Sequence, residues 1–150
     1  MLPTGFEHGE IECNLAVCLK LFLRSQNLGK VLTGEVGIYI RRDPDSIRAA
    51  DLLFISHERL RQVRSTSYLD VAPELVVKVL SPGDSWSETA EKMEDYFFIG
   101  VQQVWLADPR RKTLHMFRAI TDSTLLRTGD PMPDIPFLPG FYLNLDEIFG

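Results

Sequence analysis

One short segment, residues 72–82, constrains the fold of this chain more than any other. It reads Ala-Pro-Glu-Leu-Val-Val-Lys-Val-Leu-Ser-Pro, an apolar block between two prolines. A short block rich in Val and Leu and bounded by turn-forming residues is typical of a strand buried on both faces. Because side chains alternate along a strand, one face should carry Glu74, Val76, Lys78 and Leu80. The segment therefore predicts a strand inside a sheet.

A lysine in the middle of such a strand is unusual. Burying the Lys78 ammonium group costs free energy unless the group is paired, and buried charges concentrate at functional sites. In the alternative interpretation, the long side chain extends along apolar surface and places its charge in water at a sheet edge. The pattern alone leaves both interpretations open.

Length and composition indicate an ordinary globular domain. The chain has 150 residues, of which 45% are hydrophobic and 25% charged, and this predicts one domain over residues 1–150. A net charge of −5 argues against a general nucleic-acid coat protein. Arginine-rich stretches at residues 41–48, 59–64 and 110–112 are more typical of solvated loops and helix faces. With no membrane-length apolar run and no basic-then-apolar leader, a cytoplasmic location is expected.

The cysteines and histidines are not spaced along the chain as metal ligands usually are. Cys13 and Cys18 are five residues apart in an expected helix and point to different faces, which predicts core thiols without a disulfide or a zinc site. His8, His57 and His115 are scattered and are interpreted as structural or surface residues.

Hydrophobic periodicity predicts a mixed α/β fold around one sheet. Helices are expected over residues 9–24, 85–99 and 143–149, with a short helix or turn over 57–64. Strands are expected over residues 30–40, 47–55, 74–80, 101–107 and 112–118, with an edge strand over 124–127.

The helix over residues 85–99 has a clear start and a clear apolar stripe. Ser85 and Glu88 have the spacing of a capping box, in which each side chain bonds a free backbone N–H of the other residue. Trp86, Met93 and Phe97 follow helical spacing and are expected to be buried against the sheet.

Four polar residues are candidates for chemistry: Asp51, Glu74, Lys78 and Lys92. Metal-assisted phosphodiester cleavage needs carboxylates to hold a divalent ion and a lysine to stabilise charge or position water. Adjacent strands can bring Asp51 beside residue 78, and the following helix can place Lys92 over both. Each also has an ordinary interpretation: strand-edge carboxylates for Asp51 and Glu74, and a surface ion pair with Glu88 for Lys92.

Five motifs occur in order along the chain. They are Asp51 before an apolar run, Pro-Glu-Leu-Val-Val-x-Val-Leu-Ser-Pro at 73–82, Glu-x3-Lys-x3-Tyr-x3-Gly-Val at 88–101, Val-Trp-Leu-x-Asp-Pro at 104–109, and Leu-Pro-Gly-Phe at 138–141. Together they resemble the putative restriction endonuclease family of the PD-(D/E)XK nuclease superfamily, in the branch whose lysine has moved onto a helix. The resemblance covers residues 8–149.

This resemblance implies a restriction-endonuclease-like core, Mg²⁺ or Mn²⁺ as cofactor and DNA as substrate. It assigns Asp51 as the metal-binding aspartate and Lys92 as the helix-borne catalytic lysine. Position 78 is where the family has its glutamate, and this chain has Lys78 there. The family pattern also includes an additional N-terminal segment with an acidic strand residue, which is either absent here or lost to a misplaced start.

Two functions follow as hypotheses. The first is a metal-dependent DNA endonuclease with Asp51, Lys78 and Lys92 in the catalytic site and with Asp51 and Glu74 as metal ligands. The second is a catalytically inactive nuclease-fold protein that serves as a binding or interaction module and could form a homodimer. Lys78 favours the second, because its charge would repel a divalent ion and is expected to form an ion pair with Asp51 instead.

Overall fold

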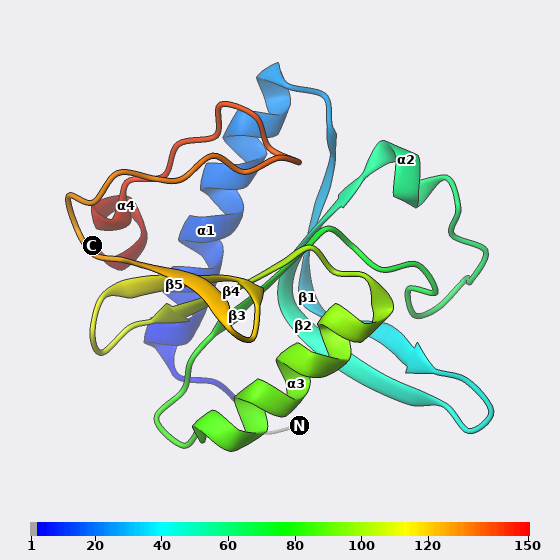
Figure 1. Cartoon of the computed structure of the whole chain (residues 1–150). Coiled ribbons are helices and arrows are strands. Elements are labelled where there is room, and N and C mark those ends of the chain that lie inside the picture. Colours follow the sequence, from blue (N-terminus) through cyan, green and yellow to red (C-terminus); the bar gives the residue numbers. More distant parts are fainter. Residues whose placement is uncertain (1–2) are drawn as a thin grey trace.

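A six-stranded mixed sheet lies between two long helices in the computed structural model, which describes residues 3–150 (Figure 1). The strands are β1 (Gly29–Arg41), β2 (Ser46–Ser56), β3 (Leu75–Val79), β4 (Gln103–Asp108), β5 (Thr113–Ala119) and β6 (Asp122–Leu126). The helices are α1 (Phe6–Ser25), α2 (His57–Leu60), α3 (Trp86–Ile99) and α4 (Leu145–Phe149). The mixed α/β fold predicted from the sequence is confirmed.

The strands follow one another across the sheet in chain order. Every neighbouring pair is antiparallel except β3 and β4, which are parallel and are joined by α3 as a crossover helix. The Val-rich segment therefore forms an interior strand, as its two-sided apolar pattern predicted. Within β3 every side chain is buried except that of Lys78, which is partly buried.

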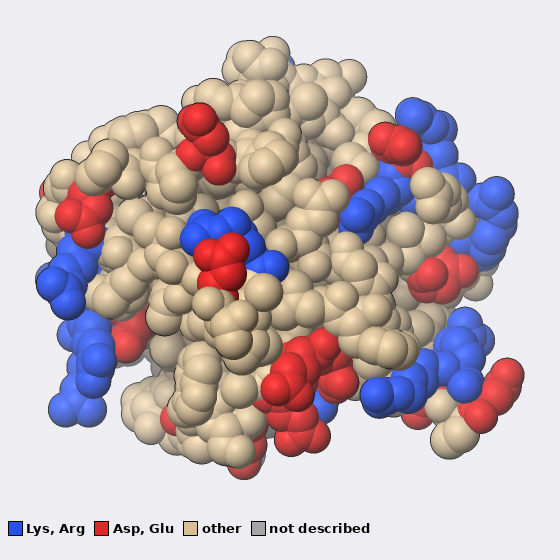
Figure 2. All heavy atoms as spheres, viewed as in Figure 1, with Lys and Arg blue, Asp and Glu red and all other residues tan. Residues whose placement is uncertain are grey.

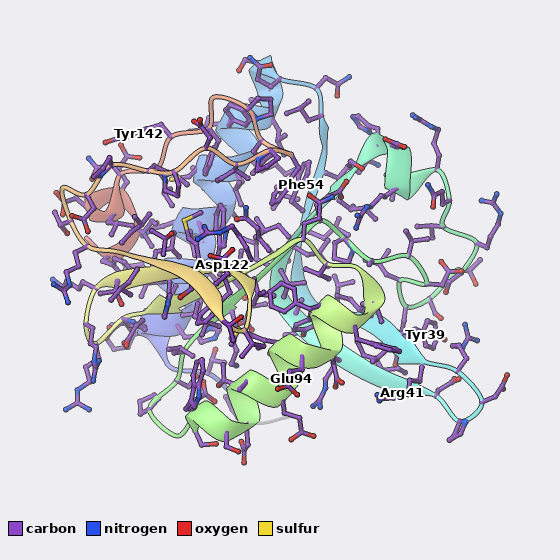
Figure 3. All side chains as sticks on the ribbon, in the orientation of Figure 1. Tyr39, Arg41, Phe54, Glu94, Asp122 and Tyr142 are labelled. Atoms are coloured by element: carbon purple, nitrogen blue, oxygen red, sulfur yellow. The ribbon has the colours of Figure 1, made fainter. Side chains whose placement is uncertain are left out.

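The two faces of the sheet carry separate cores. On one face, Ile11, Leu15 and Leu19 of α1 pack against Val77 and Trp105. The rest of this layer comes from the C-terminal tail, residues 127–150, whose buried side chains are Ile135, Leu138, Phe141, Leu143, Leu145 and Ile148. The tail is tied to the helix by the Asn14 side-chain amide, which donates to the Ile148 carbonyl at 2.9 Å. Phe54, labelled in Figure 3, lies near the end of β2, and its ring stacks on that of Phe137 in the tail with centroids 5.9 Å apart.

The other face is covered by α3, whose buried residues are Thr89, Met93 and Tyr96. The predicted cap is present, because the Ser85 hydroxyl accepts the Glu88 backbone N–H. The expected burial of Trp86 is wrong: this residue is 57% exposed. It lies in the first turn, above Phe117 of β5 with ring centroids 5.9 Å apart, where no further layer covers it.

Phe97 is only partly buried, since the sheet-facing stripe runs through Thr89, Met93 and Tyr96 and leaves it at the flank. At the other end of the chain, α1 begins at Phe6, three residues before the predicted start. None of the helices within residues 3–150 is long and apolar enough to span a membrane.

Candidate functional site

The candidate site lies where β2 and β3 separate. Their antiparallel register pairs Phe54 with Leu75, Leu53 with Val76 and Leu52 with Val77, and there the pairing ends. One step further along this register, Asp51 and Lys78 would be opposite each other. Beyond this point a side chain replaces the backbone acceptor: the Asp51 carboxylate accepts the backbone N–H of Val79 at 2.8 Å. The predicted neighbourhood of Asp51 and position 78 is therefore present at the backbone level.

The partner of the Asp51 carboxylate is a histidine and not a lysine. His8 Nε2 of α1 lies 3.3 Å from Asp51 Oδ2, and both side chains are almost covered, with exposed fractions of 11% and 12%. The Asp51 carboxylate thus has two polar contacts, a backbone N–H and an imidazole nitrogen. Both help to hold α1 and β3 against the end of β2.

Lys78 points to another carboxylate. Its Nζ lies 3.6 Å from Asp84 in the loop before α3, and its side chain is 24% exposed. The expected Asp51–Lys78 ion pair is therefore wrong. The reason is that the pairing of β2 with β3 ends one step before these two residues would be opposite each other. The Asp51 carboxylate turns instead to the Val79 N–H and to His8 of α1, while Lys78 stays on the α3 face with Val76. β3 is an interior strand, so Lys78 does not lie at a sheet edge, but its ammonium group is partly exposed beside Asp84, as the alternative interpretation expected for its charge.

Glu74 has a structural role. It is buried, accepts the backbone N–H of Ser56 at 2.9 Å and lies 3.5 Å from the Arg59 guanidinium. The same guanidinium donates to the carbonyls of Ala72, Pro73 and Gly100, so this pair fastens α2 to the entrance of β3. Glu74 precedes β3, at the opposite end from Lys78. It is therefore not placed to replace the carboxylate expected at position 78.

Lys92 lies at the flank of the sheet-facing stripe of α3. It is three residues after Thr89 and four before Tyr96, both buried, and is itself partly buried. The Tyr96 hydroxyl donates to the Ala49 carbonyl at 3.0 Å, two residues before Asp51. The Lys92 side chain is partly buried and forms no ion pair with any residue of the described part of the chain, so the expected pair with Glu88 is absent there.

Electrostatics link Tyr96 to the same region. Burial raises the pKa of the Tyr96 hydroxyl, the Arg48 guanidinium opposes this rise, and the negative charges of Asp51 and Asp95 add to it. Arg48 itself lies 2.9 Å from Asp95 and 3.8 Å from Glu91, which fixes α3 to β2. Tyr96 is therefore neutral at physiological pH, and α3 is held firmly over the point where β2 and β3 separate.

A further carboxylate reaches the site from α1. Glu12 is one helical turn after His8, and its pKa is raised, first by burial and then by the charge of Asp51. His8 lowers the pKa of Glu12 and Glu35 raises it. Glu12 and Asp51 are thus near enough to interact. Even so, within residues 3–150 no three His, Cys, Asp or Glu side chains are grouped closely enough to hold a metal ion.

The surface around the site is not uniformly basic. Figure 2 shows acidic side chains gathered over α3, and basic ones over α2 and the end of the β1–β2 hairpin. Figure 3 shows Glu94 on the side of α3 away from the sheet and Arg41 at the hairpin. Lys78 and Lys92 are the two partly buried lysines of β3 and α3 near this site.

Three contributors to the site were not predicted from the sequence: His8, Glu12 and Asp84. His8 and Glu12 have the i, i+4 spacing that places two side chains on one helix face, but the predicted helix began after His8. Asp84 immediately precedes the predicted cap residue Ser85 and lies six residues after Lys78. This short separation in the sequence could have indicated the observed Lys78–Asp84 pair.

Comparison with known proteins agrees with this fold. The sequence model of the Uma2 family, described as "Putative restriction endonuclease", matches residues 1–146. Among solved structures, a putative nuclease belonging to DUF820 from Anabaena variabilis superposes with a TM-score of 0.79 at 18% identity, and the match covers 99% of this chain and 83% of that one. No curated protein matches the chain. The family match spans nearly the whole sequence, and the chain therefore belongs to the Uma2 family of putative restriction endonucleases.

Proposed function

We propose that this chain binds DNA phosphates where β2 and β3 separate, and that it does so without hydrolysis dependent on a divalent metal at this site. The observation that carries the proposal is Lys78, an ammonium group at the position where the resemblance implies a glutamate. Lys92 lies at the flank of the sheet-facing stripe of α3 near the same region. Two partly buried lysines suit a phosphate, which would replace Asp84 as the partner of Lys78. The family is the source of the expectation that the phosphate belongs to DNA.

The residues present do not fit the Mg²⁺ or Mn²⁺ that the family implies. Of the expected ligands, Glu74 is held by Arg59 and Ser56, and Asp51 is left with His8 and the Val79 N–H. Position 78 offers an ammonium group, paired with Asp84, in place of a third carboxylate. One carboxylate does not hold the ion, because magnesium needs a near-octahedral shell of oxygen ligands.

Replacing Lys78 tests both parts of the proposal. Lys78→Met should weaken binding of a fluorescein-labelled DNA duplex, measured by anisotropy, and lower the slope of log affinity against log salt by about 1. Arg110→Met, at an exposed position in the β4–β5 turn, is the matched control and should change neither. Lys78→Glu should introduce Mn²⁺ binding, measured by calorimetry. The proposal fails if the natural chain binds Mn²⁺ as tightly as Lys78→Glu, or if Lys78→Met binds DNA unchanged.

A metal-dependent endonuclease is the second candidate, and the raised pKa of Glu12 favours it. Because Asp51 contributes to that rise, Glu12 and Asp51 would together offer two carboxylates, with His8 beside them. These side chains would have to move closer together, since within residues 3–150 no such group is close enough to hold a metal ion. In this case the natural chain would bind Mn²⁺ and cleave a supercoiled plasmid, and Glu12→Gln would abolish both. That outcome would replace the first proposal, since Lys78 would then leave the metal site intact.

A further inference from the structure

A groove runs between the second half of α1 and the start of β1. Its volume is about 500 Å³. Its apolar lining includes Val17, Leu21 and Val31. Val17 and Leu21 are 49% and 56% exposed, large values for aliphatic side chains on a helix that otherwise packs inward. The groove therefore presents an apolar surface that no residue of the described chain covers.

One wall of this groove is an open sheet edge. β1 is the outermost strand, and only its second half has a neighbour on the outer side. There, Tyr39 N–H donates to the Leu69 carbonyl and Leu69 N–H to the Gly37 carbonyl, both at 2.9 Å. Within residues 3–150 no segment pairs with the outer side of residues 29–33. The backbone groups that point outward from this half of β1 are free to pair with an added strand.

The rim of the groove is basic. Lys20, Arg24 and Lys30 are among its lining residues, and no Asp or Glu is. This contrasts with the chain as a whole, in which 21 acidic residues outnumber 16 basic ones. The local charge thus opposes the net charge, and it would attract carboxylates.

We infer that this groove binds an extended acidic peptide segment of another protein, which adds as a strand to residues 30–33 of β1. Main-chain hydrogen bonds to the open edge would give affinity, and alternate side chains would distinguish partners. Apolar side chains on one face of the segment would contact Val17 and Leu21. The carboxylates, which alternate with them on the other face, would lie beside Lys30, and the rim cations Lys20 and Arg24 would attract them at longer range. A second copy of the chain fits less well, since antiparallel pairing of two β1 edges would bring two basic rims together.

The direct test uses an alternating valine–glutamate hexapeptide with a fluorescein label and fluorescence polarisation as the readout. Saturable binding is expected, together with slower amide exchange at residues 30–33 measured by hydrogen–deuterium exchange. An alternating valine–lysine peptide should bind about tenfold more weakly or not at all. A valine–glutamate peptide with a central proline, which lacks a strand N–H, should also lose binding.

Variants of this chain locate the binding. The double variant Lys20→Glu, Lys30→Glu should lower affinity about tenfold, and Leu21→Ser should lower it several-fold. The matched control is Leu125→Ser on β6, which is 43% exposed at the opposite edge of the sheet and should have no effect. Because all four positions are exposed, these variants should fold normally, which circular dichroism would check.

Cys13 provides an independent readout. It is an exposed thiol in the lining of the groove, whereas Cys18 is partly buried and its pKa is raised, first by burial and then by Glu147. The valine–glutamate peptide should therefore slow alkylation of Cys13 by iodoacetamide, and Cys13→Ser should remove the protected signal. The inference is overturned if the acidic and basic peptides bind equally, if Leu125→Ser weakens binding as much as Leu21→Ser, or if Cys13 is not protected. These results are independent of DNA or metal binding.

Discussion

The carboxyl group of Glu12 lies in an environment that resists its ionisation. Its folded-state pKa lies above the ordinary value of 4.5, because burial disfavours the charged form and Asp51 repels it. A carboxyl whose pKa is raised on folding binds more protons in the folded than in the unfolded chain. The stability linked to it is therefore fully present below its unfolded pKa and is lost as pH rises through the folded pKa.

The upward shift of the Glu12 pKa gives a prediction for Glu12→Gln. The neutral amide cannot ionise, so the variant should be more stable than the natural chain at neutral pH, and the difference should shrink as pH falls toward the ordinary value of 4.5. Urea unfolding across this pH range measures the effect. Glu10→Gln, at an exposed position of the same helix, is the control and should show little difference. An advantage of Glu12→Gln that grows at acid pH would contradict the assignment.

Single-residue contacts were the part of the site that sequence reasoning predicted least well. The types and order of Asp51, Lys78 and Lys92 could be recognised, because they recur within local motifs. Their partners could not, since His8 meets Asp51 across 43 positions of the chain and only the packing of α1 sets that contact. Strand adjacency predicts an Asp51–Lys78 pair, but the β2–β3 pairing ends one step earlier, and Lys78 lies beside Asp84 instead.

At the scale of elements, α3 shows that helical spacing alone does not decide which side chains are buried. Met93 is 1% exposed and packs with Val76 and Leu106, whereas Trp86 is 57% exposed although it follows the same spacing. Met93→Ala should therefore lower the free energy of unfolding by about 2–4 kcal/mol, measured in urea. Trp86→Ala is the comparison from the same helix and should cost less than about 1 kcal/mol. Equal losses for both variants would show that the helix register is different.

Local signals explain why the elements themselves were predictable. The apolar block between two prolines specified β3, and the Ser85 cap with Gly100 at the end specified α3, where Gly100 adopts a φ of 106°. β1 carries an irregularity that the alternation did not reveal. Gly34 and Glu35 have φ values of 91° and 57°, and the register to β2 shifts there. Such a bulge changes which side chains face the core without changing the pattern of residue types.

The whole molecule depends on a layer that has little regular structure. The C-terminal tail has Pro131, Pro133, Pro136 and Pro139, and its sequence predicted only a short closing helix. In the structure it completes the α1 core with side chains such as Leu138 and Ile148, each 0% exposed. Proline-rich segments lack helical and strand periodicity. The sequence therefore indicates that most of the tail has no regular secondary structure, but it does not indicate which surface the tail covers.

This dependence leads to a prediction about the tail as a unit. A chain that ends at Asp134 would expose the apolar face of α1 together with Trp105, which is otherwise 0% exposed and stacks near Phe141 with ring centroids 6.3 Å apart. Such a chain should bind the dye ANS and lose its cooperative urea transition, because a core open on one side keeps secondary structure without fixed packing.

A point variant keeps this prediction testable if the shortened chain aggregates. Ile148→Ala removes a fully buried side chain next to the carbonyl that accepts the Asn14 amide, and should lower the free energy of unfolding by about 2–5 kcal/mol. Tyr142→Ala, in the same tail but 70% exposed, should change it by less than about 0.5 kcal/mol. If Ile148→Ala is as mild as Tyr142→Ala, or the shortened chain still unfolds cooperatively, the tail is not part of the folding unit.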